Sequence, residues 1–140
     1  MGFFNKFSSN TELTPAIALA TSMIYMMASD GEITDEEINY LAVKLYAIGD
    51  ANELMKLSQK YSKKQDLEAF QKEANEKLTE DQKFTILANL IDILLADGDA
   101  DEDEQNLFFS FVEAFGISEE DIQPYIDILS IKNDLASFVE

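Results

Sequence analysis

Two short acidic segments contain the side chains of this sequence that are best suited to chemistry. Residues 30–37 read DGEITDEE and residues 97–104 read DGDADEDE, so each opens with Asp-Gly and carries a glutamate six residues after the glycine. The first segment holds five carboxylates and the second holds six. Neighbouring carboxylates repel one another unless they are solvated, protonated or bridged by a cation. Their oxygens suit hard cations such as calcium, magnesium and manganese.

The sequence contains no histidine and no cysteine. The side chains left for catalysis or metal binding therefore act mainly through oxygen atoms. Disulfides and Cys-bearing zinc or iron–sulfur sites need cysteine. Ser–His and Cys–His nucleophiles and the di-iron Glu-x-x-His bundle need histidine. A metal-assisted hydrolase built from carboxylates alone needs a general base and an open coordination position in a pocket, and the sequence identifies no nucleophile. We therefore expect a non-enzymatic protein with no organic cofactor.

Each acidic segment is also explained as a helix end, a tight turn and a new helix start. Its glycine can adopt the left-handed conformation that ends a helix. Thr34 with Glu37 forms the pattern of a capping box, and Asp101 with Glu104 is its acidic variant. The aspartate that opens each segment is left unexplained, because a helix C-terminus disfavours negative charge by roughly 0.3–1 kcal/mol. Capping and cation binding both stay open.

The segments do not form EF-hand loops. If Asp30 and Glu37 stand at positions 5 and 12 of such a loop, Met26 stands at position 1, and the second copy has Ile93 there. Neither side chain can bind calcium, so this class of site is excluded.

A displacement of 67 residues relates more than the two acidic segments. It also brings chemically similar residues into register on both sides of them: Ile24 with Ile91, Met27 with Leu94, Leu41 with Phe108, Leu45 with Val112, and Gly49 with Gly116. We interpret the sequence as two related helical hairpins, at about residues 14–49 and 80–116.

The hairpins must position the acidic segments. Their first helices are expected to begin after Thr14 and Thr79 and to be buried, because apolar residues lie almost all round them. Their second helices are amphipathic and end at Gly49 and Gly116. Further helices are predicted at about 51–61 and 64–77, broken near Ser62, then from residue 118 to about 130, with a short one following. Period-two alternation is missing, so we predict one all-α domain of about seven helices over residues 1–140.

Two further features have alternative explanations. Met23, Met26 and Met27 have the spacing of core residues, with a soft-metal site as the alternative. Asp92 lies in an apolar run. It either occupies a notch at the surface of the helix bundle or is a fifth cation ligand.

The composition excludes several classes of protein. The formal charge is −18, yet 46% of the residues are hydrophobic, so the chain is neither a disordered acidic tail nor a nucleic-acid binder. The longest apolar run, residues 16–28, is too short to cross a bilayer, and we expect no membrane insertion. With no export signal recognised, we expect a cytoplasmic protein.

The duplicated Asp-Gly and glutamate motif, together with the MGFFNKF opening, resembles the TerB family of tellurite-resistance proteins. A TerB-like module also occurs beside J-domains in some co-chaperones. The resemblance implies a duplicated all-helical fold in which the motif acids meet near a pseudo-twofold axis. It carries the candidate metal ligands over to Asp30, Glu37, Asp97 and Glu104. Repeat two departs from repeat one where Ala100 replaces the aliphatic Ile33.

The expected function follows from this resemblance. We expect a non-enzymatic protein of tellurite or chemical-stress resistance that binds a divalent cation or a protein partner through its acidic surface, in an oligomeric state that the sequence leaves open. Additional ligands or a solvated rim would come from Glu32, Asp99 and Asp103. The alternative is a protein-interaction module without metal, in which the motif acids only cap helices.

Overall fold

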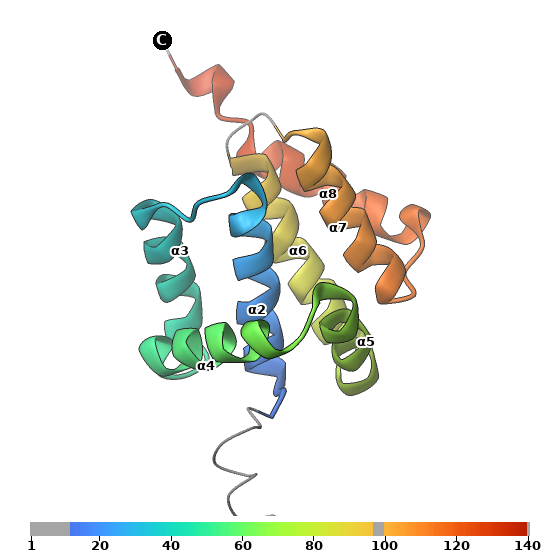
Figure 1. The fold of residues 1–140 in the computed structure, drawn as a ribbon. Helices are drawn as coiled ribbons and strands as arrows, with labels where there is room; N and C mark the ends of the chain where they lie inside the picture. Colours follow the sequence, from blue (N-terminus) through green and yellow to red (C-terminus); the bar gives the residue numbers. More distant parts are fainter. Residues whose placement is uncertain (1–11, 97–99, 140) are drawn as a thin grey trace, which may run out of the picture.

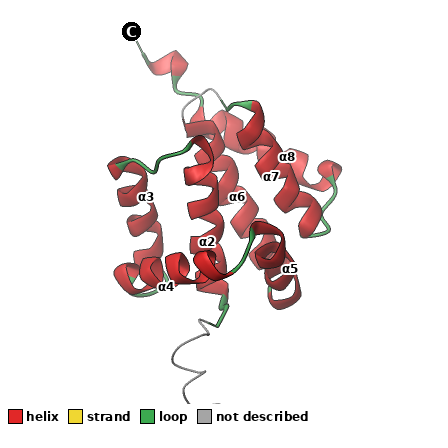
Figure 2. Ribbon diagram, viewed as in Figure 1, coloured by secondary structure: helices red, strands yellow, loops and turns green. Residues whose placement is uncertain are grey.

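The computed structural model describes residues 12–96 and 100–139, apart from the side chain of Asp30. In these ranges the chain is helical and contains no strand, so the all-α prediction is confirmed (Figure 2). The seven α-helices of the described residues are α2 (Pro15–Met27), α3 (Asp35–Tyr46), α4 (Ala51–Lys64), α5 (Leu67–Lys77), α6 (Glu80–Ala96), α7 (Glu102–Ala114) and α8 (Glu119–Asn133). Two short 3-10 helices are η1 (Ala28–Asp30) and η2 (Ala136–Phe138). None of the helices described is both long and apolar enough to cross a membrane.

Short polar side chains start these helices. In each case the N-cap side chain accepts a hydrogen bond from the backbone N–H three residues later, which satisfies a donor that the first turn leaves unpaired. The residues that make this contact are Thr14, Thr34, Asp50, Asp66, Thr79, Asp101 and Ser118. The predicted starts after Thr14 and Thr79 and at Ser118 are confirmed.

The predicted break near Ser62 is wrong. The helix α4 continues to Lys64, and the Ser62 hydroxyl donates to the carbonyl of Gln59 at 2.9 Å within it. Serine therefore satisfies its hydroxyl locally without ending the helix. The break falls instead at Asp66, whose carboxylate accepts from the Ala69 N–H at 2.7 Å and so starts α5.

The two predicted central helices lie side by side. Figure 1 shows α2 and α6 running in the same direction through the middle of the molecule, with α3 and α4 beside α2, and α7 and α8 beside α6. The core between them is aromatic and aliphatic, and its largest fully buried side chains include Phe70, Phe108, Phe111 and Met23. The three clustered methionines, Met23, Met26 and Met27, all belong to this core.

The parallel course of α2 and α6 brings equivalent helix ends together. The C-terminal ends of α2 and α6 and the N-terminal ends of α3 and α7 lie at the same end of the molecule (Figure 1). A displacement of 67 residues carries the start of α3 at Asp35 onto the start of α7 at Glu102, and places α2 within the bounds of α6. The duplication and the single-domain boundaries at 1–140 stay interpretations of the sequence.

Glycines follow the second helix of each hairpin, as predicted. Gly116 has a φ of 67°, and its N–H donates to the carbonyl of Glu113 at 3.0 Å. The next N–H, of Ile117, donates to the carbonyl of Val112 at 3.1 Å. These two bonds form a Schellman motif, which ends α7. Gly49 lies beyond α3, and its N–H donates to the carbonyl of Leu45 at 3.1 Å.

Candidate cation-binding pocket

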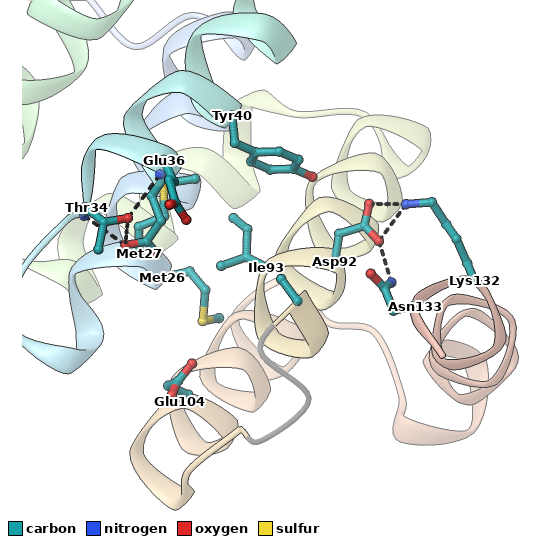
Figure 3. Close-up of a pocket in the computed structure, with 12 residues that line it drawn as sticks. Met26, Met27, Thr34, Glu36, Tyr40, Asp92, Ile93, Glu104, Lys132 and Asn133 are labelled. Atoms are coloured by element: carbon teal, nitrogen blue, oxygen red, sulfur yellow. Dashed lines mark hydrogen bonds and ion pairs between the residues drawn. The ribbon is translucent and has the colours of Figure 1, made fainter. Parts of the chain in front are cut away.

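A pocket of about 430 Å³ opens between the two hairpins, at the end where α2 and α6 finish. Five elements contribute to it, namely α2, α3, α6, α7 and α8 (Figure 3). Its lining residues are Met26, Met27, Thr34, Glu36, Glu37, Tyr40, Asp92, Ile93, Ala96, Glu104, Lys132 and Asn133. The lining thus combines several apolar side chains with four carboxylates and one ammonium group. We call this cavity the acidic pocket.

Glu37 and Glu104, the glutamates that stand six residues after the glycine of each acidic segment, both line the acidic pocket. Glu37 is the third residue of α3 and Glu104 is the third residue of α7, so they hold equivalent positions in the two hairpins. Two of the four predicted metal ligands therefore share one cavity. Asp97 lies outside the described residues, and so does the side chain of Asp30, whose backbone ends η1. The four-carboxylate site as a whole stays a prediction.

The capping interpretation is confirmed in the first segment. The Thr34 hydroxyl accepts from the Glu37 N–H at 3.1 Å, and Glu37 Oε1 accepts from the Thr34 N–H at 3.0 Å. This reciprocal pair is a complete capping box. In the second segment, Asp101 Oδ1 accepts from the Glu104 N–H at 2.8 Å. Because one Glu37 oxygen is engaged at the helix end while the side chain lines the pocket, capping and cation binding are compatible there.

The turn that joins α2 to α3 depends on Gly31. Its φ is 111°, and its N–H donates to the Ala28 carbonyl at 3.0 Å. A residue with a Cβ is strained at that φ, so the glycine of the first acidic segment has a conformational role. The predicted role of Gly98 falls outside the described residues.

The inner wall of the acidic pocket is apolar. Met26 and Met27 are each 1% exposed and belong to the core, and the partly buried Ile93 packs against that core. The core interpretation of the methionines therefore fits the structure, and the same side chains close the inner end of the pocket (Figure 3).

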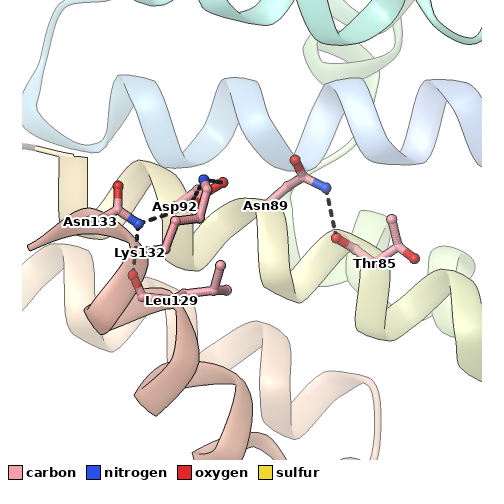
Figure 4. A network of polar contacts seen from close by, with 6 residues as sticks. All are labelled: Thr85, Asn89, Asp92, Leu129, Lys132 and Asn133. Carbon is pink, nitrogen blue, oxygen red and sulfur yellow. Dashed lines mark hydrogen bonds and ion pairs between the residues drawn. The ribbon is translucent and has the colours of Figure 1, made fainter.

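At the far side of the pocket, Asp92 joins α6 to the end of α8 (Figure 4). The Lys132 ammonium donates to Asp92 Oδ1 at 3.0 Å and to Oδ2 at 2.9 Å, and the Asn133 side chain donates to Oδ1 at 2.9 Å. The Asp92 side chain is 12% exposed. Burial raises the pKa of this carboxyl, but the hydrogen bonds from Asn133 and Lys132, with the charges of Lys132 and Lys44, outweigh burial and lower it overall. Asp92 is thus an ion-pair partner within the pocket wall.

Tyr40 reaches the same wall from α3. Its hydroxyl points toward the Asp92 carboxylate (Figure 3). Burial raises the pKa of Tyr40, and so do the negative charge of Asp92 and a hydrogen bond to it. Tyr40, Lys132 and Asn133 were not predicted as site residues, because each lies far in the sequence from Asp92 and none belongs to the duplicated motif.

Within the described part of the chain, no three carboxylates lie close enough together to hold a metal ion. Glu32 and Asp103 are exposed, as expected for a solvated rim, and Asp99 lies outside the described residues. The described carboxylates that could contribute to a cation site are therefore Glu37 and Glu104, with Glu36 beside them.

Comparison with known proteins identifies the family. No curated protein and no solved structure matches the chain. The family described as tellurite resistance protein TerB matches residues 16–125, which extend from α2 into α8 and include both acidic segments. The chain belongs to the TerB tellurite-resistance family.

Proposed function

We propose that this protein acts in tellurite or chemical-stress resistance without catalysing a reaction, by binding a divalent cation in the acidic pocket. Family membership supports the area of function. The observation that supports the cation proposal is that Glu37 and Glu104, from equivalent positions of two hairpins, line the same cavity. Asp30 and Asp97 are the remaining proposed ligands. Calcium, magnesium and manganese are the candidate ions, because the ligands are carboxylates.

The proposed mechanism is mechanical coupling of the hairpins. Glu37 belongs to α3 and Glu104 to α7, and these helices flank opposite members of the central pair. A cation held between them would neutralise the repulsion among the clustered acids and fix the relative angle of the two hairpins. The ion-bound form would then present a defined acidic surface to a protein partner.

The second candidate function is a protein-interaction module without metal. The complete capping box at Thr34 and Glu37 favours it, since capping alone explains why a glutamate stands at that position. This module would bind a basic surface of a partner protein through its acidic face, and added salt would weaken that binding. Chelators would not change the binding of this partner.

Thermal melts of chelator-stripped protein, titrated separately with calcium, magnesium and manganese, test the cation proposal. A ligand of the folded state at a hundredfold its Kd stabilises by about 2.7 kcal/mol. An unfolding entropy of about 2.1 cal/mol/K per residue converts this to a rise in Tm of roughly 9 °C for a chain of 140 residues. We expect a saturable rise for one ion above that for sodium chloride at matched ionic strength.

Two double variants complete this test. Asp30→Asn with Asp97→Asn should abolish the ion-specific rise. Asp35→Asn with Glu102→Gln is the matched control, because it removes the same charge from the exposed first residues of α3 and α7, which do not line the pocket. A small rise shared by all salts and all variants would reflect screening of the net charge, and would support the interaction module instead.

A further inference from the structure

The acidic pocket has a composition that a bare metal ion does not require. Ile93 and Ala96 give it apolar surface that solvent can reach, the lining methionines Met26 and Met27 are buried, and Glu36, Glu37 and Glu104 supply carboxylates to the same lining (Figure 3). A hard ion gains nothing from thioether and aliphatic groups, since it takes oxygen ligands. A cation that carries hydrocarbon would use both parts, burying its chain against the apolar part of the lining while its charge meets the carboxylates.

The chain itself already places such a cation in this pocket. The Lys132 side chain comes from α8, and its ammonium group lies within 3.0 Å of both Asp92 oxygens. Its side chain remains 60% exposed, so it covers one edge of the cavity and leaves the rest open. The Tyr40 ring stands at this edge as well (Figure 3), and an aromatic face attracts a nearby ammonium group.

The lining charges favour another cation. Four carboxylates line the pocket, from Glu36, Glu37, Asp92 and Glu104, and Lys132 is the cation among the lining residues. Lys132 is bound to Asp92, and the other three lining carboxylates belong to α3 and α7. An anionic or neutral apolar ligand would have to approach this charge without compensating it.

We propose that the acidic pocket binds an alkylammonium group, a primary amine on a chain of several methylene groups. Its source is either a lysine side chain of a partner protein or a free linear amine. The methylene chain lies along Ile93 and Ala96, and the ammonium group meets the carboxylates of Glu36 and Glu104. This proposal uses the carboxylates of the same acidic pocket as the proposed function. It goes beyond that function because it requires no metal ion.

The test is a titration followed by NMR of isotope-labelled methionine methyl groups, in the presence of a chelator. Met26 and Met27 report on the pocket wall, and Met55, on α4 and outside the lining, is the internal control. The probes are ammonium chloride and then ethyl-, butyl- and hexylammonium at constant ionic strength. We expect saturable shifts at Met26 and Met27, and a Kd that falls about two- to fourfold for each methylene group that is buried.

Two variants locate the charge contact. Glu36→Gln should weaken butylammonium binding severalfold, whereas Asp35→Asn, in the same exposed first turn but outside the lining, should leave it nearly unchanged. The chain-length series on the unmodified protein does not depend on either variant's folding. The source of the amine is distinguished by comparing Nα-acetyl-lysine amide with pentylammonium, which carries the same single charge, and the tighter ligand identifies it.

A Kd that is independent of chain length, or shifts at Met55 as large as those at Met26, would overturn the proposal and leave only charge screening. Because the titration contains chelator, it does not respond to loss of the metal site. Amine binding without an ion-specific rise in Tm would refute the divalent cation alone. An ion-specific rise without amine binding would refute the alkylammonium proposal alone.

Discussion

Substitutions of Glu37 separate its capping role from its proposed ligand role. One of its oxygens accepts from the Thr34 N–H and hydroxyl, at 3.0 and 3.2 Å. Glu37→Gln keeps an acceptor oxygen for this capping box and removes the charge. Glu37→Ala removes both, at a cost of about 1 kcal/mol for the hydrogen bond and about 0.5 kcal/mol for the charge at the helix N-terminus.

These contributions predict an ordered set of melting temperatures. With an unfolding entropy of about 0.3 kcal/mol/K for a chain of this length, Glu37→Ala should lower Tm by about 5 °C and Glu37→Gln by about 2 °C. Both variants should lose the ion-specific rise, because neither has a carboxylate at that position. The assay is thermal unfolding followed by far-UV circular dichroism, with and without the divalent ion.

The matched control is Glu53→Ala. Glu53 is also the third residue of a helix, after the N-cap Asp50, and lies outside the acidic pocket. It should retain the ion-specific rise. If Glu37→Gln retained the full rise as well, Glu37 would not be a ligand. If Glu37→Ala cost no more than Glu53→Ala, the magnitude assigned to the capping box would be refuted.

Three other variants test the account of the fold. Asp92→Asn should destabilise by about 1–2 kcal/mol near neutral pH, through weaker hydrogen bonds to Lys132 and Asn133. Since the folded pKa of Asp92 is lowered, this difference should persist above about pH 4, the usual carboxyl pKa, and vanish as pH falls through the folded value. A pH series of melts for both proteins checks it, and a constant difference would contradict it. Gly116→Ala should cost about 1 kcal/mol in urea unfolding from its φ of 67° alone, because an added Cβ meets no atom within 4 Å. Phe70→Ala should cost about 3–5 kcal/mol in the same assay, since this ring is fully buried between Tyr25, Tyr61 and Phe111, and a smaller loss would indicate that the core collapses around it.

Helix starts could be predicted because their signals are local. The contacts at Thr14, Thr34 and Ser118 each join residues three apart, so the sequence contains both partners within one turn. The break between α4 and α5 was misplaced for the same physical reason. Ser62 satisfies its hydroxyl inside a helix, whereas Asp66 caps the next one, and serine and aspartate both suit either position.

The acidic pocket could be predicted only in part. The duplicated motif, through the family that it resembles, pointed to Glu37 and Glu104, and both line the pocket. The Asp92 ion pair could not be found in this way, since Lys132 lies 40 residues further along the chain. Its position depends on how α8 packs against α6, and periodicity along the chain does not specify that packing. The contribution of Met26 and Met27 to the pocket lining was missed because the sequence suggested only core packing or a soft-metal site for them.

The most direct test of the central claim is to locate a bound ion by its paramagnetic effect. Manganese added to chelator-stripped protein broadens NMR signals near its site, and the methionine methyl groups again serve as reporters. The account predicts that substoichiometric manganese broadens Met26 and Met27, in the pocket wall, well before Met55 on α4, and that the Asp30→Asn, Asp97→Asn variant loses this selectivity. Equal broadening of all three signals, or unchanged selectivity in the variant, would contradict a cation site between the two hairpins.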